Sequence, residues 1–182
     1  MNMTIGQEIP VLGNWFKLLF IENPGMAFGM LGDDGLIKTI LSVFRIVAVV
    51  VLLIILVRLS KKGTKFGVLF GFSLIIAGAM GNILDCLFYG EMFSESTYTQ
   101  LASIFPDGGG YASWLHGKVV DMLYFPIIDI ARDSNSWLPD FFFGSDGHFI
   151  FFRPVFNLAD SAITIGVFYM IIFQWKWLKS LG

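Results

Sequence analysis

The hydrophobic residues of this chain gather in three long stretches separated by polar segments. The stretches cover residues 37–57, 66–87 and 154–175. A helix that crosses a membrane needs roughly 20 mainly apolar residues, so the pattern predicts three spans. Pro154 at the start of the third stretch suits a first helical turn, where its missing N–H is not needed.

The segments between these stretches have different patterns. Residues 9–28 alternate loosely and are rich in aromatic side chains, which predicts short strands within an extramembrane segment over residues 1–36. Residues 88–153 form a second extramembrane segment. Its first part, 90–110, is rich in Ser, Thr and Gly and predicts a loop or flap. Residues 111–132 are apolar again, but Pro126 and two acids disfavour a full span there. We expect a partial re-entry or a strand at the membrane interface.

The amino-acid composition indicates which class of protein this is. Hydrophobic residues make up 55%, mean hydropathy is +0.72, and only 14% of residues are charged, so a soluble fold would lack polar groups to cover its surface. The chain is expected to be a single-domain, α-helical integral membrane protein. The net charge of −2 provides no basic field for nucleic acid. The lone Cys86 excludes an intrachain disulfide, and His116 and His148 are too isolated to predict a metal site. No cofactor is expected.

Charge in the short connecting segments predicts the orientation. The cations Arg58, Lys61, Lys62 and Lys65 lie between the first two stretches with no acid among them, and two more lysines follow the third stretch. Short loops rich in Lys and Arg stay in the cytoplasm. The two long segments are therefore expected outside. Three spans would also place the N-terminus outside although no signal peptide is visible, which suggests a further helix upstream.

Polar residues in the second and third stretches indicate a functional site. Ionisable groups within spans are costly and usually functional. The third stretch carries Asn157, Asp160, Ser161 and Thr164 on one helical face, and the second carries Gly67, Gly71, Gly78, Asn82 and Asp85 on another. Both faces bring carboxylates to the outer interface, where Asp121 is also expected. Two close carboxylates retain one proton between them and can act as general base and general acid on a water that attacks a peptide carbonyl.

Each of these residues also has a simpler structural interpretation. Asn82 and Asp85 could cap and fix a helix end, and Asp160 could be a buried hydrogen-bonding residue between helices. Asp121 stays undecided on physical grounds alone, which favour pairing Asp85 with Asp160. The sequence has no HExxH or GxSxG motif, so the commoner protease chemistries are not indicated.

Four sequence blocks then narrow the interpretation. They are ENPGMAF at 22–28, GAMGNILD at 78–85, VVDMLYFP at 119–126 and FNLADSAI at 156–163. With these blocks in this order, the chain resembles the bacterial lipoprotein signal peptidase family, also called signal peptidase II. The resemblance implies a bundle of four helices, of which three are visible here, with an outer β cradle and an interfacial flap. It implies that Asp121 and Asp160 are catalytic and that Asn23, Asn82, Asp85 and Asn157 line or brace the site.

The resemblance also implies a function. Family members are intramembrane aspartyl endopeptidases of the bacterial inner membrane, with the active site on the outer side. They remove signal peptides from diacylglyceryl-modified prolipoproteins by cutting before the lipidated cysteine, and globomycin inhibits them. Membrane lipids and the prolipoprotein are the expected partners of a monomeric chain.

The chain departs from the family pattern in three ways. The usual first helix is absent, Cys86 replaces an arginine, and the outer segments are longer than usual. The alternative function is a non-catalytic membrane protein that binds lipidated peptides. A transporter is disfavoured, because the charges within the apolar stretches cluster at one surface and form no path across.

Overall fold

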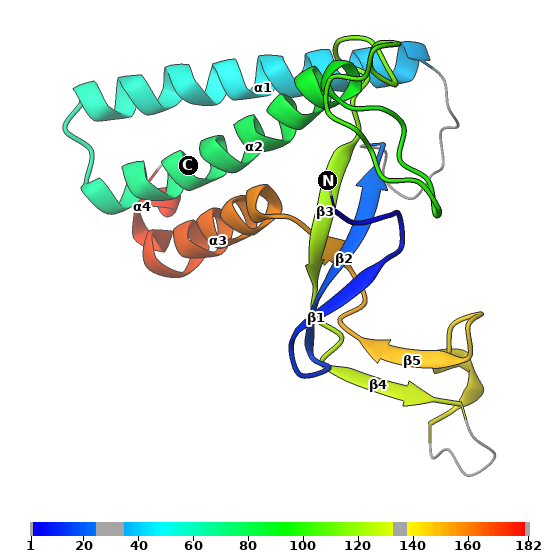
Figure 1. Ribbon diagram of the computed structural model, residues 1–182. Coiled ribbons are helices and arrows are strands. Elements are labelled where there is room, and N and C mark those ends of the chain that lie inside the picture. The colour runs from blue at the N-terminus through cyan, green and yellow to red at the C-terminus, as the bar shows by residue number, and fades with distance from the viewer. Residues whose placement is uncertain (1, 25–34, 133–137, 181–182) are drawn as a thin grey trace.

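The computed structural model describes residues 2–24, 35–132 and 138–180. Its main helices are α1 (Gly35–Lys61), α2 (Phe66–Met92) and α3 (Leu158–Phe173), followed by the short α4 (Trp175–Lys179). Figure 1 shows α2 between α1 and α3, with a β-sheet standing across one end of this bundle. We call this the sheet end, and the opposite end, where α1 connects to α2, the loop end.

The apolar runs form helices whose outer surfaces remain apolar. Both α1 and α2 are long and apolar enough to cross a membrane, whereas α3 is a shorter apolar helix. Large side chains such as Phe44, Val47 and Ile54 on α1 are exposed, as expected of a helix that meets lipid rather than water. In lipid, the backbone must satisfy its own hydrogen bonds, which favours helix even in a run rich in valine and isoleucine. The helices predicted over 37–57 and 66–87 are confirmed.

The third apolar stretch differs from the prediction. Val155 and Phe156 form the short strand β6 (Val155–Phe156), which pairs with Leu123 and Tyr124, and the helix begins only at Leu158. The proposed place of Pro154 in the first helical turn is therefore wrong. The cause is pairing with a strand more than 30 residues away, which overrides the local hydrophobic pattern.

The sheet contains the strands expected near the N-terminus. Its order is β1 (Glu8–Leu12), β2 (Phe16–Asn23), β3 (Val119–Tyr124) and β6, and all neighbours are antiparallel. The predicted strands within residues 9–28 are confirmed as β1 and β2, while 25–28 lie outside the described residues. The strand interpretation of residues 111–132 holds for β3. Ile21 of β2 faces Asp121 of β3 across the ladder.

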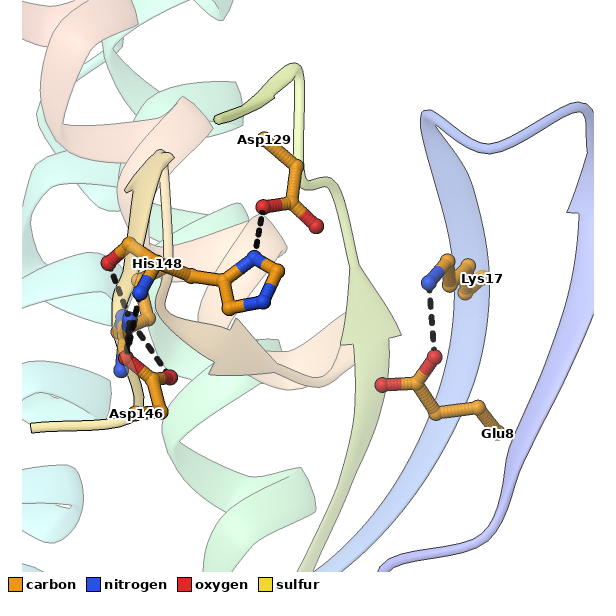
Figure 2. Close-up of polar contacts among 6 residues, drawn as sticks. Glu8, Lys17, Asp129, Asp146 and His148 are labelled. Atoms are coloured by element: carbon orange, nitrogen blue, oxygen red, sulfur yellow. Dashed lines mark hydrogen bonds and ion pairs between the residues drawn. The ribbon is translucent and has the colours of Figure 1, made fainter. Parts of the chain in front are cut away.

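A two-stranded ribbon extends from the sheet. It pairs β4 (Ile128–Ala131) with β5 (His148–Phe151), and a 3₁₀ turn, η2 (Asp140–Phe142), precedes β5. His148 Nδ1 lies 2.7 Å from an Asp129 carboxylate oxygen (Figure 2). Arg153 donates to Asp146. All four side chains are substantially exposed. The segment expected as an outer flap thus contains β3 and this ribbon.

Residues 110–117 are held on the last turns of α2. The backbone N–H groups of Tyr111, Ala112 and Gly117 donate to the carbonyls of Phe93, Gly90 and Cys86. The end of a helix leaves carbonyls without partners inside the helix, and this loop satisfies those of Gly90 and Phe93. The contact needs glycine, because a Cβ on Gly117 would come within 2.6 Å of the Asp85 carbonyl oxygen. The loop therefore fixes where β3 begins relative to α2.

Small residues bring α2 and α3 close together. A Cβ on Gly71 would lie 2.5 Å from Met170 Sδ, and one on Gly78 would collide with the backbone carbonyl of Ala159. Gly166 of α3 packs on α2 in the same way. Interfaces between membrane helices use such residues for close approach. The predicted small-residue face of α2 is confirmed, and it sets the spacing at which polar side chains of the two helices meet.

Candidate active site

Asp121 lies in the middle of β3 and is the most deeply buried carboxylate of the site, with 4% of its surface exposed. Both of its carboxylate oxygens accept hydrogen bonds from amides. Asn23 Nδ2 on β2 donates at 3.1 Å, and Asn157 Nδ2 donates at 2.9 Å. The β2–β3 pairing and the β3–β6 pairing bring these two amides to Asp121 from opposite sides of the strand.

Asn157 and Asp160 together begin α3. Asn157 is the N-cap residue, and its Oδ1 accepts from the backbone N–H of Asp160 at 2.9 Å. Asp160 Oδ2 accepts in return from the backbone N–H of Asn157, at 3.4 Å. This is a capping box, which satisfies backbone donors at the start of a helix. The helix start therefore fixes the position of both side chains.

Asn82 on α2 completes the link between the two aspartates. Asn157 Nδ2 donates to Asn82 Oδ1 at 3.1 Å, and Asn82 Nδ2 donates to Asp160 Oδ1 at 2.8 Å. The orientations follow from the cap: because a backbone N–H can only donate, Asn157 must turn its oxygen to Asp160 N and its NH₂ outward. Asn82 must then accept from Asn157, which leaves its own NH₂ for Asp160.

The network thus connects Asp121 to Asp160 through Asn157 and Asn82. Burial raises the pKa of Asp121, and the nearby charge of Asp160 acts in the same direction. The amide of Asn23 opposes the shift, because its hydrogen bond favours the ionised form of Asp121. A buried carboxyl group with a raised pKa beside a second carboxylate is typical of acid–base catalysis.

A cavity of about 460 Å³ lies beside the network. Asp85, Tyr89 and Asn157 contribute polar groups to its lining. The remainder is mainly apolar and comes from β2, α2, β3 and α3: Leu18, Gly81, Val120, Met122, Leu123, Leu158 and Ala159. Its size is within the range of small-molecule and peptide sites, and its apolar walls suit an aliphatic chain.

Asp85 lies outside the hydrogen-bonded network, although it is close enough to Asp121 and Asp160 to interact with their charges. Asp85 lines the cavity and interacts with the backbone of Val120 and the side chain of Tyr89. Because α2 continues to Met92, Asp85 does not cap the helix, so that interpretation is wrong. The pairing of Asp85 with Asp160, which helical faces alone favoured, lacks a chain of hydrogen bonds like the one through Asn157 and Asn82 among the described residues. Asp121, undecided on those grounds, is the residue joined to Asp160.

Several nearby contacts had no sequence signal. Arg45 Nη1 of α1 approaches Cys86 Sγ at 3.7 Å, which brings a cation next to the position after Asp85. Lys118, the residue before β3, pairs with Glu22 of β2 at 2.9 Å. These partners lie 41 and 96 residues apart in sequence, so no local pattern could reveal them. Within the described ranges, no group of three His, Cys, Asp or Glu residues could hold a metal ion.

Tyr111 braces the same part of the sheet. Its hydroxyl accepts from the backbone N–H of Lys118 at 2.7 Å, and the Lys118 ammonium lies 5.2 Å from its ring centre. Burial raises the pKa of Tyr111 to about 12, so the hydroxyl stays protonated at neutral pH. The loop that caps α2 is thereby joined to the start of β3.

The long apolar helices and the buried carboxylate network define a helical membrane protein with a paired-carboxylate site. The family described as signal peptidase (SPase) II matches residues 1–176. The chain therefore belongs to the signal peptidase II family, and this membership makes it a protease.

Relatives support the same assignment. The chain is 48% identical over 173 residues to a lipoprotein signal peptidase of Porphyromonas gingivalis, covering 94% of this chain and 72% of the relative. It is 38% identical to a lipoprotein signal peptidase of Amoebophilus asiaticus, with coverage of 94% and 67%.

Two solved structures share the fold. Both are described as bacterial membrane enzymes studied by the in meso method. One has a TM-score of 0.53 at 24% identity, covering 96% of this chain and 74% of the other. The second has a TM-score of 0.51 at 26% identity, covering 94% and 76%.

Proposed function

We propose that this protein is an intramembrane aspartic endopeptidase that removes signal peptides from diacylglyceryl-modified prolipoproteins, cutting before the lipidated cysteine. The observation that carries the proposal is the hydrogen-bonded connection of Asp121 to Asp160 through Asn157 and Asn82. Family membership supports the substrate class, since relatives are named lipoprotein signal peptidases.

In the proposed reaction, the ionised carboxylate of the pair takes a proton from water while the oxygen attacks the scissile carbonyl carbon. The protonated carboxyl group donates its proton to the carbonyl oxygen, giving a neutral tetrahedral diol. Collapse of this intermediate re-forms the C=O bond, breaks the C–N bond and transfers a proton to the leaving amine. The pair ends with one proton, as it began.

The surroundings of the two aspartates favour one distribution of that proton. Asp121 is nearly fully buried, and burial raises its pKa. Asp160 lies in the first turn of α3, where the helix dipole and capping N–H stabilise an anion. We therefore assign the resting proton to Asp121 as general acid and the general-base role to Asp160. Asn23, Asn82 and Asn157 hold the carboxyl groups, and Asp85 supports the cavity wall.

The remaining parts of the proposal concern the surroundings. The mainly apolar cavity of about 460 Å³ next to Asn157 suits the lipid-modified part of the substrate or a globomycin-type inhibitor. The lysines at the loop end indicate that this end faces the cytoplasm. The site then faces the outer side of the bacterial inner membrane, and the protein acts as a monomer among membrane lipids.

The decisive experiment measures cleavage of a diacylglyceryl-prolipoprotein by Asp121→Asn and Asp160→Asn. Each change keeps the side-chain size and should lower kcat/KM by at least about 1000-fold. Asp129→Asn is the matched control, because Asp129 is an exposed carboxylate outside the network, and it should cleave normally.

Full activity in either site variant would contradict the catalytic assignment. A wild-type chain that binds the precursor without cleaving it would instead support the non-catalytic, lipidated-peptide-binding alternative. Circular dichroism of each purified variant checks that loss of activity does not reflect unfolding.

A further inference from the structure

A second, larger cavity lies at the loop end, remote from the aspartates. Its volume is about 840 Å³, within the range of ligand sites. One wall is the α1–α2 connection at Gly63, Thr64 and Lys65, and the other is the junction of α3 and α4 over residues 172–177. Figure 1 shows α4 beneath the start of α2, at the same end of the bundle as that connection. Two segments more than 100 residues apart thus enclose one cavity.

The lining combines cations with interfacial aromatic groups. The lining includes two lysines, Lys65 and Lys176, the amide residue Gln174, and two tryptophans, Trp175 and Trp177. Ammonium groups bind phosphate oxygens with charge-assisted hydrogen bonds. Tryptophan is enriched at headgroup depth in membranes.

Protein carboxylates do not neutralise this end of the bundle. The sequence contains no Asp or Glu from residue 35 to residue 84, or after Asp160. No residue that lines the cavity is acidic. Six cations lie at this end: Arg58, Lys61, Lys62, Lys65, Lys176 and Lys179. The positive charge of this end therefore favours binding of an anionic partner.

The apolar part of the lining decides what kind of anion fits. Ile172 and Phe173 line the cavity and are 63% and 68% exposed, and they continue the apolar outer surface of α3. A free inorganic anion would make no use of these side chains. A phospholipid would place its phosphate at the lysines and its acyl chains along Ile172 and Phe173.

We propose that this cavity binds the headgroup of an anionic phospholipid, with Lys65 and Lys176 contacting the phosphate and Trp175 and Trp177 packing around it. Basic recesses between membrane helices bind lipid headgroups by this chemistry. The bound lipid joins the α1–α2 connection to the α3–α4 junction. The junction already packs tightly on α2, since a Cβ on Gly67 would lie 2.6 Å from Gln174 Nε2. The inference is independent of the proposed peptidase activity.

The test is native mass spectrometry of the full chain in detergent with phosphatidylglycerol or phosphatidylcholine added. Wild type should retain one phosphatidylglycerol with at least tenfold preference over phosphatidylcholine, and Lys65→Gln/Lys176→Gln should lower this affinity by more than about tenfold. The matched control Lys61→Gln/Lys62→Gln removes the same charge at the same end but outside the cavity lining, and it should bind within about twofold of wild type.

Two further arms keep the result interpretable. Lys65→Arg/Lys176→Arg keeps the charge and should retain the lipid even if the glutamine pair folds poorly. Phosphatidylglycerol should raise the unfolding temperature of the protein, and the same concentration of inorganic phosphate should not. Equal loss of lipid in the cavity and control pairs would overturn the proposal. Equal protection by inorganic phosphate, or no preference for phosphatidylglycerol over phosphatidylcholine, would also overturn it.

Discussion

The aspartate network and the exposed ion pairs near the ribbon use similar chemical groups in different settings. The network joins residues 36 to 98 positions apart, and its side chains are buried or half-buried. The surface pairs join residues only 7 to 19 positions apart. They are Arg153 with Asp146 and, as Figure 2 shows, Lys17 with Glu8 and His148 with Asp129.

This difference determines what each cluster contributes. An exposed ion pair is screened by water and contributes little. A buried network is costly to leave incomplete, because each lost partner strands a polar group away from water. Position in the fold, rather than charge, therefore distinguishes the candidate site from the ion pairs.

After the two aspartate variants, the largest effect is expected from Asn157→Ala. It removes the donor to Asp121, the link to Asn82 and the N-cap of α3 in one step. We expect kcat/KM for precursor cleavage to fall by about 100-fold or more. His148→Gln, which removes an exposed pair, should leave cleavage unchanged. Equal losses in these two variants would break the distinction between the clusters.

The next effect tests the spacing of α2 and α3. Gly78→Ala places a methyl group against the Ala159 carbonyl, a backbone atom that cannot turn aside. We expect a stability loss of about 1–3 kcal/mol, measured by thermal unfolding in detergent, together with reduced cleavage. Gly108→Ala is the matched control, since a Cβ there meets nothing within 4 Å. An unfolding temperature for Gly78→Ala equal to that of the control would contradict the close contact.

A third prediction concerns pH. The Asn23 amide favours ionised Asp121, so Asn23→Ala should raise the pKa of Asp121 further above its usual value. If Asp121 carries the resting proton, the protonated form then persists to higher pH. The alkaline limb of the plot of kcat/KM against pH should therefore move to higher pH than in wild type. An alkaline limb that stays at the same pH or moves to lower pH would show that Asp121 does not carry the resting proton.

The smallest effect is expected from Glu8→Gln. The Glu8 carboxylate accepts from Lys17 Nζ at 2.8 Å and raises the pKa of Lys17, but both side chains are partly exposed. Its loss should change the free energy of unfolding by less than about 1 kcal/mol, and by less still in high salt. If Glu8→Gln lowered the unfolding temperature as much as Gly78→Ala, the exposure of an ion pair would not predict its contribution to stability.

The sequence predicted the parts of the fold that depend on local pattern. The apolar run behind α1 and the glycines that face α3 are visible in the chain itself. The start of α3 was misplaced because Val155 and Phe156 pair with β3, which no local feature reveals. A signal was present nonetheless: Asn157 followed by Asp160 has the spacing of a capping box.

The site was predicted unevenly for the same reason. The motif resemblance selected Asp121 and Asp160, and the structure joins them in one network, while their catalytic role stays a prediction. Helical faces alone could not place Asp121, because it lies on a strand whose partner Asn23 is 98 residues away. Charge along the chain showed the lysines of the loop end but not that the α3–α4 junction encloses a cavity with them.

The origin of the network residues has a consequence for biogenesis. They come from β2, α2, β3 and the start of α3, in that order along the chain. A ribosome therefore releases Asn157 and Asp160 after every other member of the network. Until α3 docks on the glycines of α2, Asp121 lacks the amide of Asn157 and Asn82 lacks both of its partners. The network is therefore completed only after α3 has been synthesised and has docked on α2.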